Sequence, residues 1–134
     1  MKTLAVINNK GGVGKSTVAV QLSHGLAKME QKVLLIDLDG QQDAAMFLGF
    51  DEEDYNKTFF DLTKNHNPAD LEECIINARD NLDLLPNSNF NKIMSEFNNT
   101  ARIDVVLEKK YLKELPKYNY DFVIFDCSPT RNRI

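Results

Sequence analysis

The chain has 134 residues, of which 43% are hydrophobic, and its formal net charge is −4 at neutral pH. That length is enough for one small domain with its own hydrophobic core. The acidic balance argues against a strongly basic, nucleic-acid-binding segment, and no apolar run approaches the roughly 20 residues of a membrane-spanning helix.

The first predicted elements are a strand, a glycine-rich loop and a helix. An apolar run at residues 4–7 predicts the strand. A helix that starts near Gly14 is predicted to run to Met29, because apolar residues recur at helical spacing from Val18 onward. We expect this apolar face to lie on a sheet, with Gly25 permitting close packing. The face comprises Val18, Leu22, Leu26 and Met29.

The loop between this strand and helix has the composition of a phosphate-binding loop. Glycines at 11, 12 and 14 let successive backbone N–H groups converge on a phosphate, and the start of a helix adds further N–H donors. We expect Lys15 to reach the β- and γ-phosphates and the Ser16 hydroxyl to hold Mg²⁺. The predicted nucleotide site comprises Lys10, Gly11, Gly12, Val13, Gly14, Lys15, Ser16 and Thr17.

A second strand is predicted at residues 32–37, where a continuous apolar run is typical of a parallel strand that is covered on both faces. Strand, helix and strand make a βαβ unit, which should be right-handed. Asp37 and Asp39 stand at the carboxyl end of this strand. Ligands of α/β sheets bind at that end, so both aspartates are candidate site residues.

The middle of the chain predicts short elements. Phe59, Phe60 and Leu62 are assigned to the core rather than to a ligand site. Cys74 and Cys127 lack C-x-x-C spacing and are expected to be reduced, structural thiols. The predicted elements are helices at 44–48 (closed by Gly49), 58–64, 68–74 and 100–115 (ended by Pro116), an acidic turn at 51–54 and a strand at 82–86.

The last predicted strand covers residues 120–126 and ends in an aspartate, which is a Walker B pattern. We expect Asp126 to hold Mg²⁺ through a water molecule. Taken together, the elements predict an α/β fold with a mostly parallel sheet and helices on both faces.

Three segments resemble the ParA/MinD family of ATPases. Residues 10–17, Lys-Gly-Gly-Val-Gly-Lys-Ser-Thr, are similar to that family's deviant Walker A box, whose extra lysine is here Lys10. Residues 37–43 resemble its D-x-D-P-Q-x-N box, with Gly40 and Asp43 in place of proline and asparagine. Residues 126–129, Asp-Cys-Ser-Pro, match its D-C-x-P segment. The resemblance covers this whole chain and the first half of a typical member, so residues 1–134 are expected to form the N-terminal part of a single P-loop ATPase domain.

The resemblance implies an ATPase that binds ATP or ADP with Mg²⁺ and forms a homodimer with ATP. In the family the signature lysine, here Lys10, reaches the phosphates of the partner subunit. Lys10, Lys15 and Asp39 are the implied catalytic residues, with Asp39 orienting the attacking water. Ser16, Asp37 and Asp126 are the implied Mg²⁺ residues.

The implied role is plasmid or chromosome partition, with a centromere-binding ParB-like protein as partner and non-specific DNA bound through the half of the family domain that this chain does not contain. A cytoplasmic, nucleoid-associated location without membrane attachment is expected. Two alternatives stay open: a MinD-like positioning ATPase, which needs a C-terminal amphipathic helix, and a truncated regulatory module that does not hydrolyse ATP. The nitrogenase iron protein is disfavoured, because neither cysteine lies in a glycine-rich ligand loop.

Overall fold

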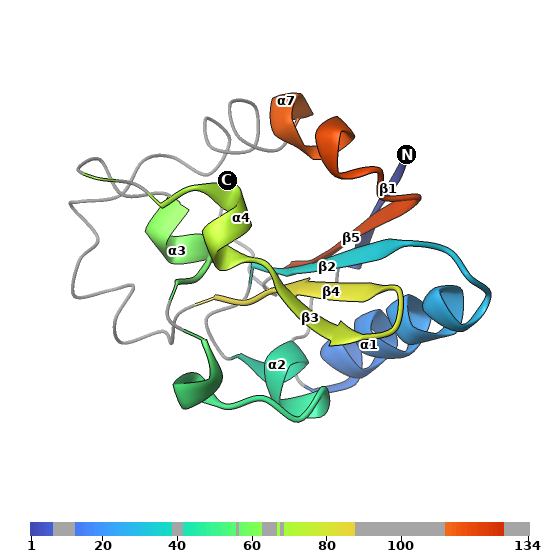
Figure 1. Cartoon of the computed structure of the whole chain (residues 1–134). Helices are drawn as coiled ribbons and strands as arrows, with labels where there is room; N and C mark the ends of the chain where they lie inside the picture. Colours follow the sequence, from blue (N-terminus) through green and yellow to red (C-terminus); the bar gives the residue numbers. More distant parts are fainter. Residues whose placement is uncertain are drawn as a thin grey trace.

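The computed structural model describes residues 1–6, 13–38, 42–55, 57–62, 67, 69–87 and 112–127. In this part of the chain one five-stranded sheet separates two layers of helices (Figure 1). The strands are β1 (Lys2–Val6), β2 (Val33–Asp37), β3 (Ile76–Arg79), β4 (Leu82–Leu85) and β5 (Phe122–Asp126). The helices are α1 (Val13–Lys28), α2 (Asp43–Phe47), α3 (Phe59–Leu62), α4 (Leu71–Cys74) and α7 (Leu112–Glu114), with 3-10 helices η1 (Glu52–Asp54) and η4 (Leu115–Tyr118).

The strand order is β1-β5-β2-β4-β3. The first four strands in this order pair in parallel, and β3 pairs antiparallel with β4 at the edge. β1 and β2 therefore lie on either side of β5, and α1 connects them across the sheet. The predicted α/β architecture, with a mostly parallel sheet and helices on both faces, is confirmed.

β2 explains why both faces of the sheet need a helical layer. All five residues of the strand are buried, as predicted from its continuous apolar run. Because side chains alternate along a strand, Leu34 and Ile36 pack into one layer while Val33 and Leu35 pack into the other.

The layer formed by α1 and α2 lies below the sheet in Figure 1. α1 packs through Ala19, Ser23 and Ala27, which are buried and spaced four residues apart. Their small side chains let the helix lie close to the strands, and the Ser23 hydroxyl donates a hydrogen bond to the Ala19 carbonyl at 2.8 Å. The fully buried residues of α1 therefore form a narrow row of small side chains, beside which the larger Val20 and Leu26 also pack against the core.

The predicted packing face of α1 is wrong. Val18, Leu22 and Met29 are 54%, 38% and 70% exposed, and of the predicted set Leu26 alone packs against the core. Successive helix residues are about 100° apart around the axis. The buried row that begins at Ala19 is therefore rotated by about 100° from the predicted face, which begins at Val18. Gly25 is exposed too, and a Cβ built there would meet no atom within 4 Å, so this glycine does not serve close packing.

The opposite layer contains α3, α4 and η4 (Figure 1). Phe59, Phe60 and Leu62 are buried, as predicted. Cys74 is buried and Cys127 is partly buried, and both are thiols rather than half of a disulfide. The core of this layer comprises Leu34, Ile36, Phe59, Leu62, Ala69, Leu71, Cys74, Leu85, Leu115, Tyr120 and Val123.

Element boundaries in the middle of the chain follow local capping. α2 is closed by Gly49, whose φ of 90° is in the left-handed region. α4 starts at Leu71, later than predicted, because Asp70 and Glu73 form a capping box in which the Asp70 N–H donates to Glu73 Oε1 at 2.9 Å. Pro68, the predicted start, lies outside the described residues.

β3 was not predicted. Its sequence, Ile-Asn-Ala-Arg, has little β-branched or aromatic character. It forms through pairing with β4 across a tight turn in which Asn81 has a φ of 65°. The edge strand therefore depends on the turn and its neighbour more than on its own residues.

Most of the helix predicted at 100–115 lies outside the described residues. α7 covers its end, and the α-helical stretch stops at Glu114; Pro116 stands in the first turn of the 3-10 helix that follows. Among the helices of the described ranges, none combines the length and apolar character needed to cross a membrane.

Candidate nucleotide and magnesium site

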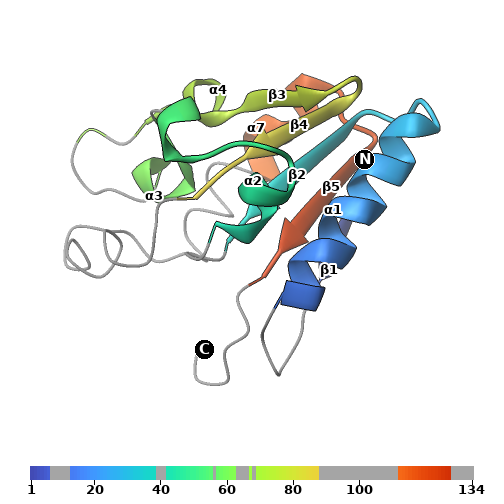
Figure 2. The same cartoon turned by 90° about the horizontal axis from the view of Figure 1, so that it is seen from below.

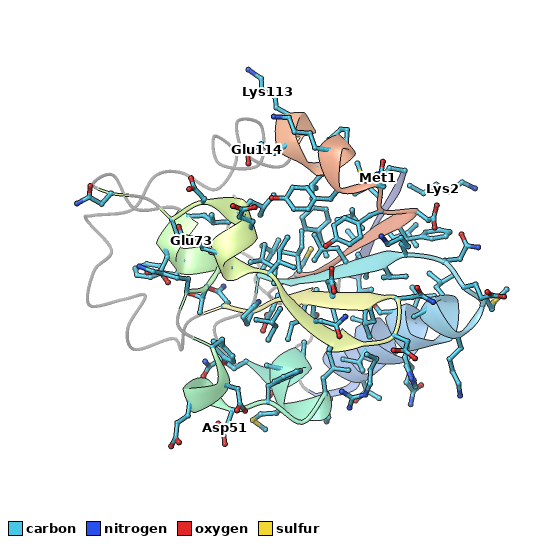
Figure 3. All side chains as sticks on the ribbon, in the orientation of Figure 1. Met1, Lys2, Asp51, Glu73, Lys113 and Glu114 are labelled. Atoms are coloured by element: carbon cyan, nitrogen blue, oxygen red, sulfur yellow. The ribbon has the colours of Figure 1, made fainter. Side chains whose placement is uncertain are left out.

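The parallel strands bring three sequence-predicted regions to one edge of the sheet. β1, β5 and β2 end in register, with Val6 beside Asp126 and Asp126 beside Asp37. Two hydrogen bonds extend this register past the strand ends: Cys127 N–H donates to the Val6 carbonyl at 3.1 Å, and Leu38 N–H donates to the Asp126 carbonyl at 3.0 Å. Figure 2 shows that α1 begins at the end of the sheet toward which the β5 arrow points.

Asp37 and Asp126 are the predicted site residues that the structure brings together. Both are 0% exposed. They also point to the same face of the sheet. Every second side chain of a strand lies on one face, so Asp37 shares a face with Val33 and Leu35, and Asp126 shares a face with Ile124. These three apolar residues pack in the α1 layer. Both carboxylates therefore belong to the face that α1 covers.

The two carboxylates fit a hard divalent cation. Neighbouring strands are about 4.8 Å apart, so the two buried carboxyl groups lie close together, and a nearby cation favours the ionised form of such groups. Carboxylate oxygens are the ligands that Mg²⁺ prefers. Mg²⁺ at nucleotide sites is usually held by one or two carboxylates together with water and substrate phosphate. Among the described residues, no group of three His, Cys, Asp or Glu side chains is placed to hold a metal.

The predicted strand and helix on either side of the glycine-rich segment are confirmed, and the segment itself lies outside the described residues. β1 ends at Val6 and α1 begins at Val13, so Gly14, Lys15 and Ser16 lie in the first turn of the helix. The backbone N–H groups of a first turn have no partner within the helix, and together with the helix dipole they favour an anion. α1 has 16 residues, so this dipole is well developed. Thr17, in the next position, is partly buried.

Several predicted site residues cannot be placed. Lys10, Gly11, Gly12 and Asp39 lie outside the described residues, as do the side chains of Val13, Gly14, Lys15 and Ser16. Their roles therefore stay predictions from the sequence and the resemblance.

The structure adds a polar cluster that the sequence reasoning did not single out as functional. Gln42 lies near the end of the 37–43 box, Asn87 follows β4, and Tyr55 follows η1. The Gln42 Nε2 atom donates to the Tyr55 hydroxyl oxygen at 2.9 Å and to the Asn87 carbonyl at 3.2 Å. The positions of Gln42 and Asn87 just past strand ends were a usable signal, whereas nothing in the sequence connected Tyr55 to them.

Comparison with known families and proteins agrees with this geometry. A family model described as an AAA domain matches residues 1–134. The sporulation initiation inhibitor protein Soj of Bacillus subtilis is 34% identical, over 96% of this chain and 50% of its own length. The chromosome partitioning protein ParA of Caulobacter vibrioides is 30% identical, over 98% of this chain and 49% of its own length. The chain thus spans about half the length of these relatives.

Solved structures show the same relationship. A plasmid partition protein of Borrelia burgdorferi superposes with a TM-score of 0.72 at 31% identity, covering 96% of this chain and 57% of that one. The septum site-determining protein MinD of Pyrococcus horikoshii, complexed with Mg-ADP, has a TM-score of 0.75 at 28% identity and covers 98% of this chain and 50% of that one. These neighbours carry the P-loop fold predicted for this chain.

Proposed function

This chain belongs to the AAA domain family, resembling its ParA and MinD ATPases, and we propose on that premise that it binds ATP or ADP with Mg²⁺ and hydrolyses ATP. The observation that carries the proposal is the pairing of two buried carboxylates, Asp37 and Asp126, at the sheet edge where α1 begins. Anion-binding N–H groups and cation-binding oxygens at one edge are what a Mg-nucleotide requires.

The proposed roles follow from residue chemistry. The backbone of residues 11–14 and the first turn of α1 hold the phosphates, and Lys15 neutralises charge on the β- and γ-phosphates. Ser16, Asp37 and Asp126 hold Mg²⁺, which when bound offsets charge on the phosphate oxygens. Asp39 orients the attacking water and accepts its proton.

The cellular role that we propose is partition of plasmid or chromosomal DNA. The relatives named Soj and ParA and the Borrelia plasmid partition protein support this role. It involves a homodimer closed by ATP through Lys10, a ParB-like partner, non-specific DNA and a cytoplasmic, nucleoid-associated location. Because this chain matches about half of each relative, these whole-protein properties are proposals for the complete ATPase.

A MinD-like positioning ATPase is the second candidate, favoured by the structural similarity to MinD bound to Mg-ADP. Both candidates share the proposed nucleotide chemistry and differ in what the dimer binds. A module that binds nucleotide without hydrolysing it is separated from both by a single-turnover ATPase assay, in which it forms no ADP.

The test is a fluorescent-nucleotide titration of the parent chain and of Lys15→Ala, each with and without Mg²⁺. We expect the parent to bind ADP and ATP in a Mg²⁺-dependent manner, and Lys15→Ala to lose binding because the phosphate charge is no longer neutralised. Lys28→Ala is the matched control, since Lys28 is an exposed lysine in the last turn of the same helix. Equal affinity of Lys15→Ala and the parent would remove the phosphate-loop assignment.

A further inference from the structure

β1 has a neighbouring strand on one side. Among the described residues it pairs with β5 and with no other strand. The Lys2 N–H donates to the Asp121 carbonyl just before β5 at 2.9 Å, and the Val6 carbonyl accepts from the N–H just after β5 at 3.1 Å. Backbone groups of alternate residues point to the same side of a strand, so those of Thr3 and Ala5 point away from β5. This outer side, which we call the β1 edge, therefore presents N–H and carbonyl groups that can pair with a further strand.

The β1 edge lacks the features that usually protect an exposed strand, which are charges, prolines and bulges. β1 reads Lys-Thr-Leu-Ala-Val and pairs with β5 in an unbroken register. β3, at the opposite edge of the sheet, has a register shift and ends in Arg79. The first four residues of β1 are exposed, although strands of a parallel sheet are normally covered on both faces. β1 thus has the character of an inner strand with one side uncovered.

α1 carries an exposed apolar flank, formed by Val18, Leu22 and Met29. These residues lie about 100–140° around the helix axis from Ser23 in the buried row. They therefore share one side of α1, beside the row that packs on the sheet.

The positions of β3 and β4 determine which way this flank faces. His24 and Lys28 lie about as far from Ser23 as the apolar flank does, but in the opposite sense around the helix. They border a hollow together with Asn81, in the turn between β3 and β4. Because β4 and β3 end the strand order opposite β1, the apolar flank faces the β1 side. Figure 2 shows β1 and α1 together at one side of the molecule and β3 at the other.

Leu4 extends the apolar flank onto the sheet. It is exposed, and it shares a face with Val6, which packs in the α1 layer. Seven large hydrophobic residues are exposed in the described ranges, and four of them, Leu4 and the three of the flank, gather here. Soluble proteins rarely leave such residues together unless a partner covers them. The β1 edge and the apolar flank therefore form one docking surface.

We propose that this docking surface binds a strand–helix unit, with the strand parallel to β1 and the helix packed on the apolar flank. Parallel strands are joined through helices, so such a unit supplies both elements. This chain matches about half the length of Soj and ParA, and we assign the unit to the further half that those relatives possess. A second copy of this chain fits less well, because two-fold symmetry pairs the same strand edge antiparallel.

The test compares the 134-residue chain with a chimera in which the unmatched half of Bacillus subtilis Soj follows residue 134. Covalent linkage makes docking intramolecular, so that even a weak contact forms. Hydrogen exchange of the Thr3 and Ala5 amides is the first readout. We expect both amides to exchange rapidly in the chain alone and at least about 100-fold more slowly in the chimera, because each gains a hydrogen-bond partner there.

Val18→Lys tests the helix contact. In the chain alone this variant should keep the parental melting temperature, since Val18 is exposed and lysine is a good helix former. In the chimera it should lower the melting temperature by about 4 °C or more, because a charge is then buried. Met46→Lys is the matched control: Met46 is similarly exposed but belongs to α2, outside the docking surface, and the change should have no effect in either chain.

Equal exchange of the Thr3 and Ala5 amides in the two chains would overturn the proposal, as would an equal effect of Val18→Lys in both. Protection of these amides that grows with the concentration of the chain alone would assign the edge to a second copy and would also overturn it. All measurements omit nucleotide, so a failure of the proposed ATPase function leaves the result unchanged.

Discussion

Asp37 and Asp126 are register partners at the last positions of β2 and β5, and both are fully buried. Residues 89 positions apart in sequence thus become neighbours through strand pairing alone. The register also places Val6, the last residue of β1, beside Asp126. The strand that leads to the proposed phosphate-binding loop and the two acidic strand ends therefore form one row.

The first prediction concerns this pair. Asp126→Asn and Asp37→Asn should each weaken Mg²⁺-dependent ADP binding by about 10- to 100-fold, because a neutral amide binds Mg²⁺ more weakly than a carboxylate. The measurement is the rise in melting temperature on adding Mg-ADP, which grows with affinity for the folded state. The expected rise is large in the parent and small in both variants.

Asp80→Asn is the control for these variants, since Asp80 is an exposed aspartate in the turn between β3 and β4. A Mg-ADP response equal to that of the parent in both variants would contradict the assignment of these carboxylates to Mg²⁺.

The sequence predicts the sheet and its acidic edge well, and the reason is physical. The runs at 33–36 and 122–125 are apolar on both faces. Both faces must therefore be covered, which happens in a parallel sheet that lies between two layers of helices. Once they are parallel, their terminal aspartates must lie on one edge. Asp37 and Asp126 are direct neighbours because β2 pairs with β5. The sequence did not show which strands would pair.

The packing of α1 could not be predicted in the same way. A stripe that includes Val18 and Leu22 satisfies helical spacing as well as the row of Ala19, Ser23 and Ala27 does. Hydrophobicity favours the first row, but the structure buries the second, whose small side chains allow a helix to pack closely on a sheet. The Gln42 cluster was missed for a related reason, since its contacts join three segments that only the fold brings together.

The second prediction concerns Tyr120, which is 7% exposed and donates a hydrogen bond of 2.6 Å from its hydroxyl to Asp83 Oδ2. This bond connects the segment just before β5 to β4, because Tyr120 stands two residues before that strand. Asn77 of β3 donates to the other oxygen of Asp83 at 3.0 Å. Tyr120→Phe should lower the free energy of unfolding by about 1.5 to 3 kcal/mol, the range for a hydrogen bond to a charged group. Chemical denaturation at pH 7 measures the difference.

The same residue predicts a pH dependence. Burial, and then the hydrogen bond and charge of Asp83, raise the pKa of Tyr120 above its ordinary value of 10.0. Because the folded-state pKa is the higher one, its contribution to stability is complete below pH 10 and is lost as the pH rises through the folded pKa. The stability of the parent should therefore fall more steeply above pH 10 than that of Tyr120→Phe. Parallel curves would show that Tyr120 ionises equally easily in both states.

The last prediction concerns Lys10, the residue that distinguishes the ParA/MinD type of loop from an ordinary phosphate-binding loop. Lys15 stands in the first turn of α1, where the helix N-terminus already favours phosphate. A second lysine five positions earlier is therefore most useful where charge must be neutralised across a dimer interface, as an arginine finger does in other NTPases.

Lys10→Ala should leave the affinity for ADP nearly intact, yet abolish ATP-dependent dimerisation and hydrolysis together. Light scattering of the complete ATPase with a non-hydrolysable ATP analogue measures the dimer, and a calorimetric ADP titration measures the monomer site. Lys28→Ala, at the far end of α1, is again the matched control. If Lys10→Ala still dimerises with the analogue, Lys10 is a loop residue without a role across the interface. If it loses ADP binding as completely as Lys15→Ala does, Lys10 serves its own phosphates, because a lysine that acts only on a partner leaves the monomer site unchanged.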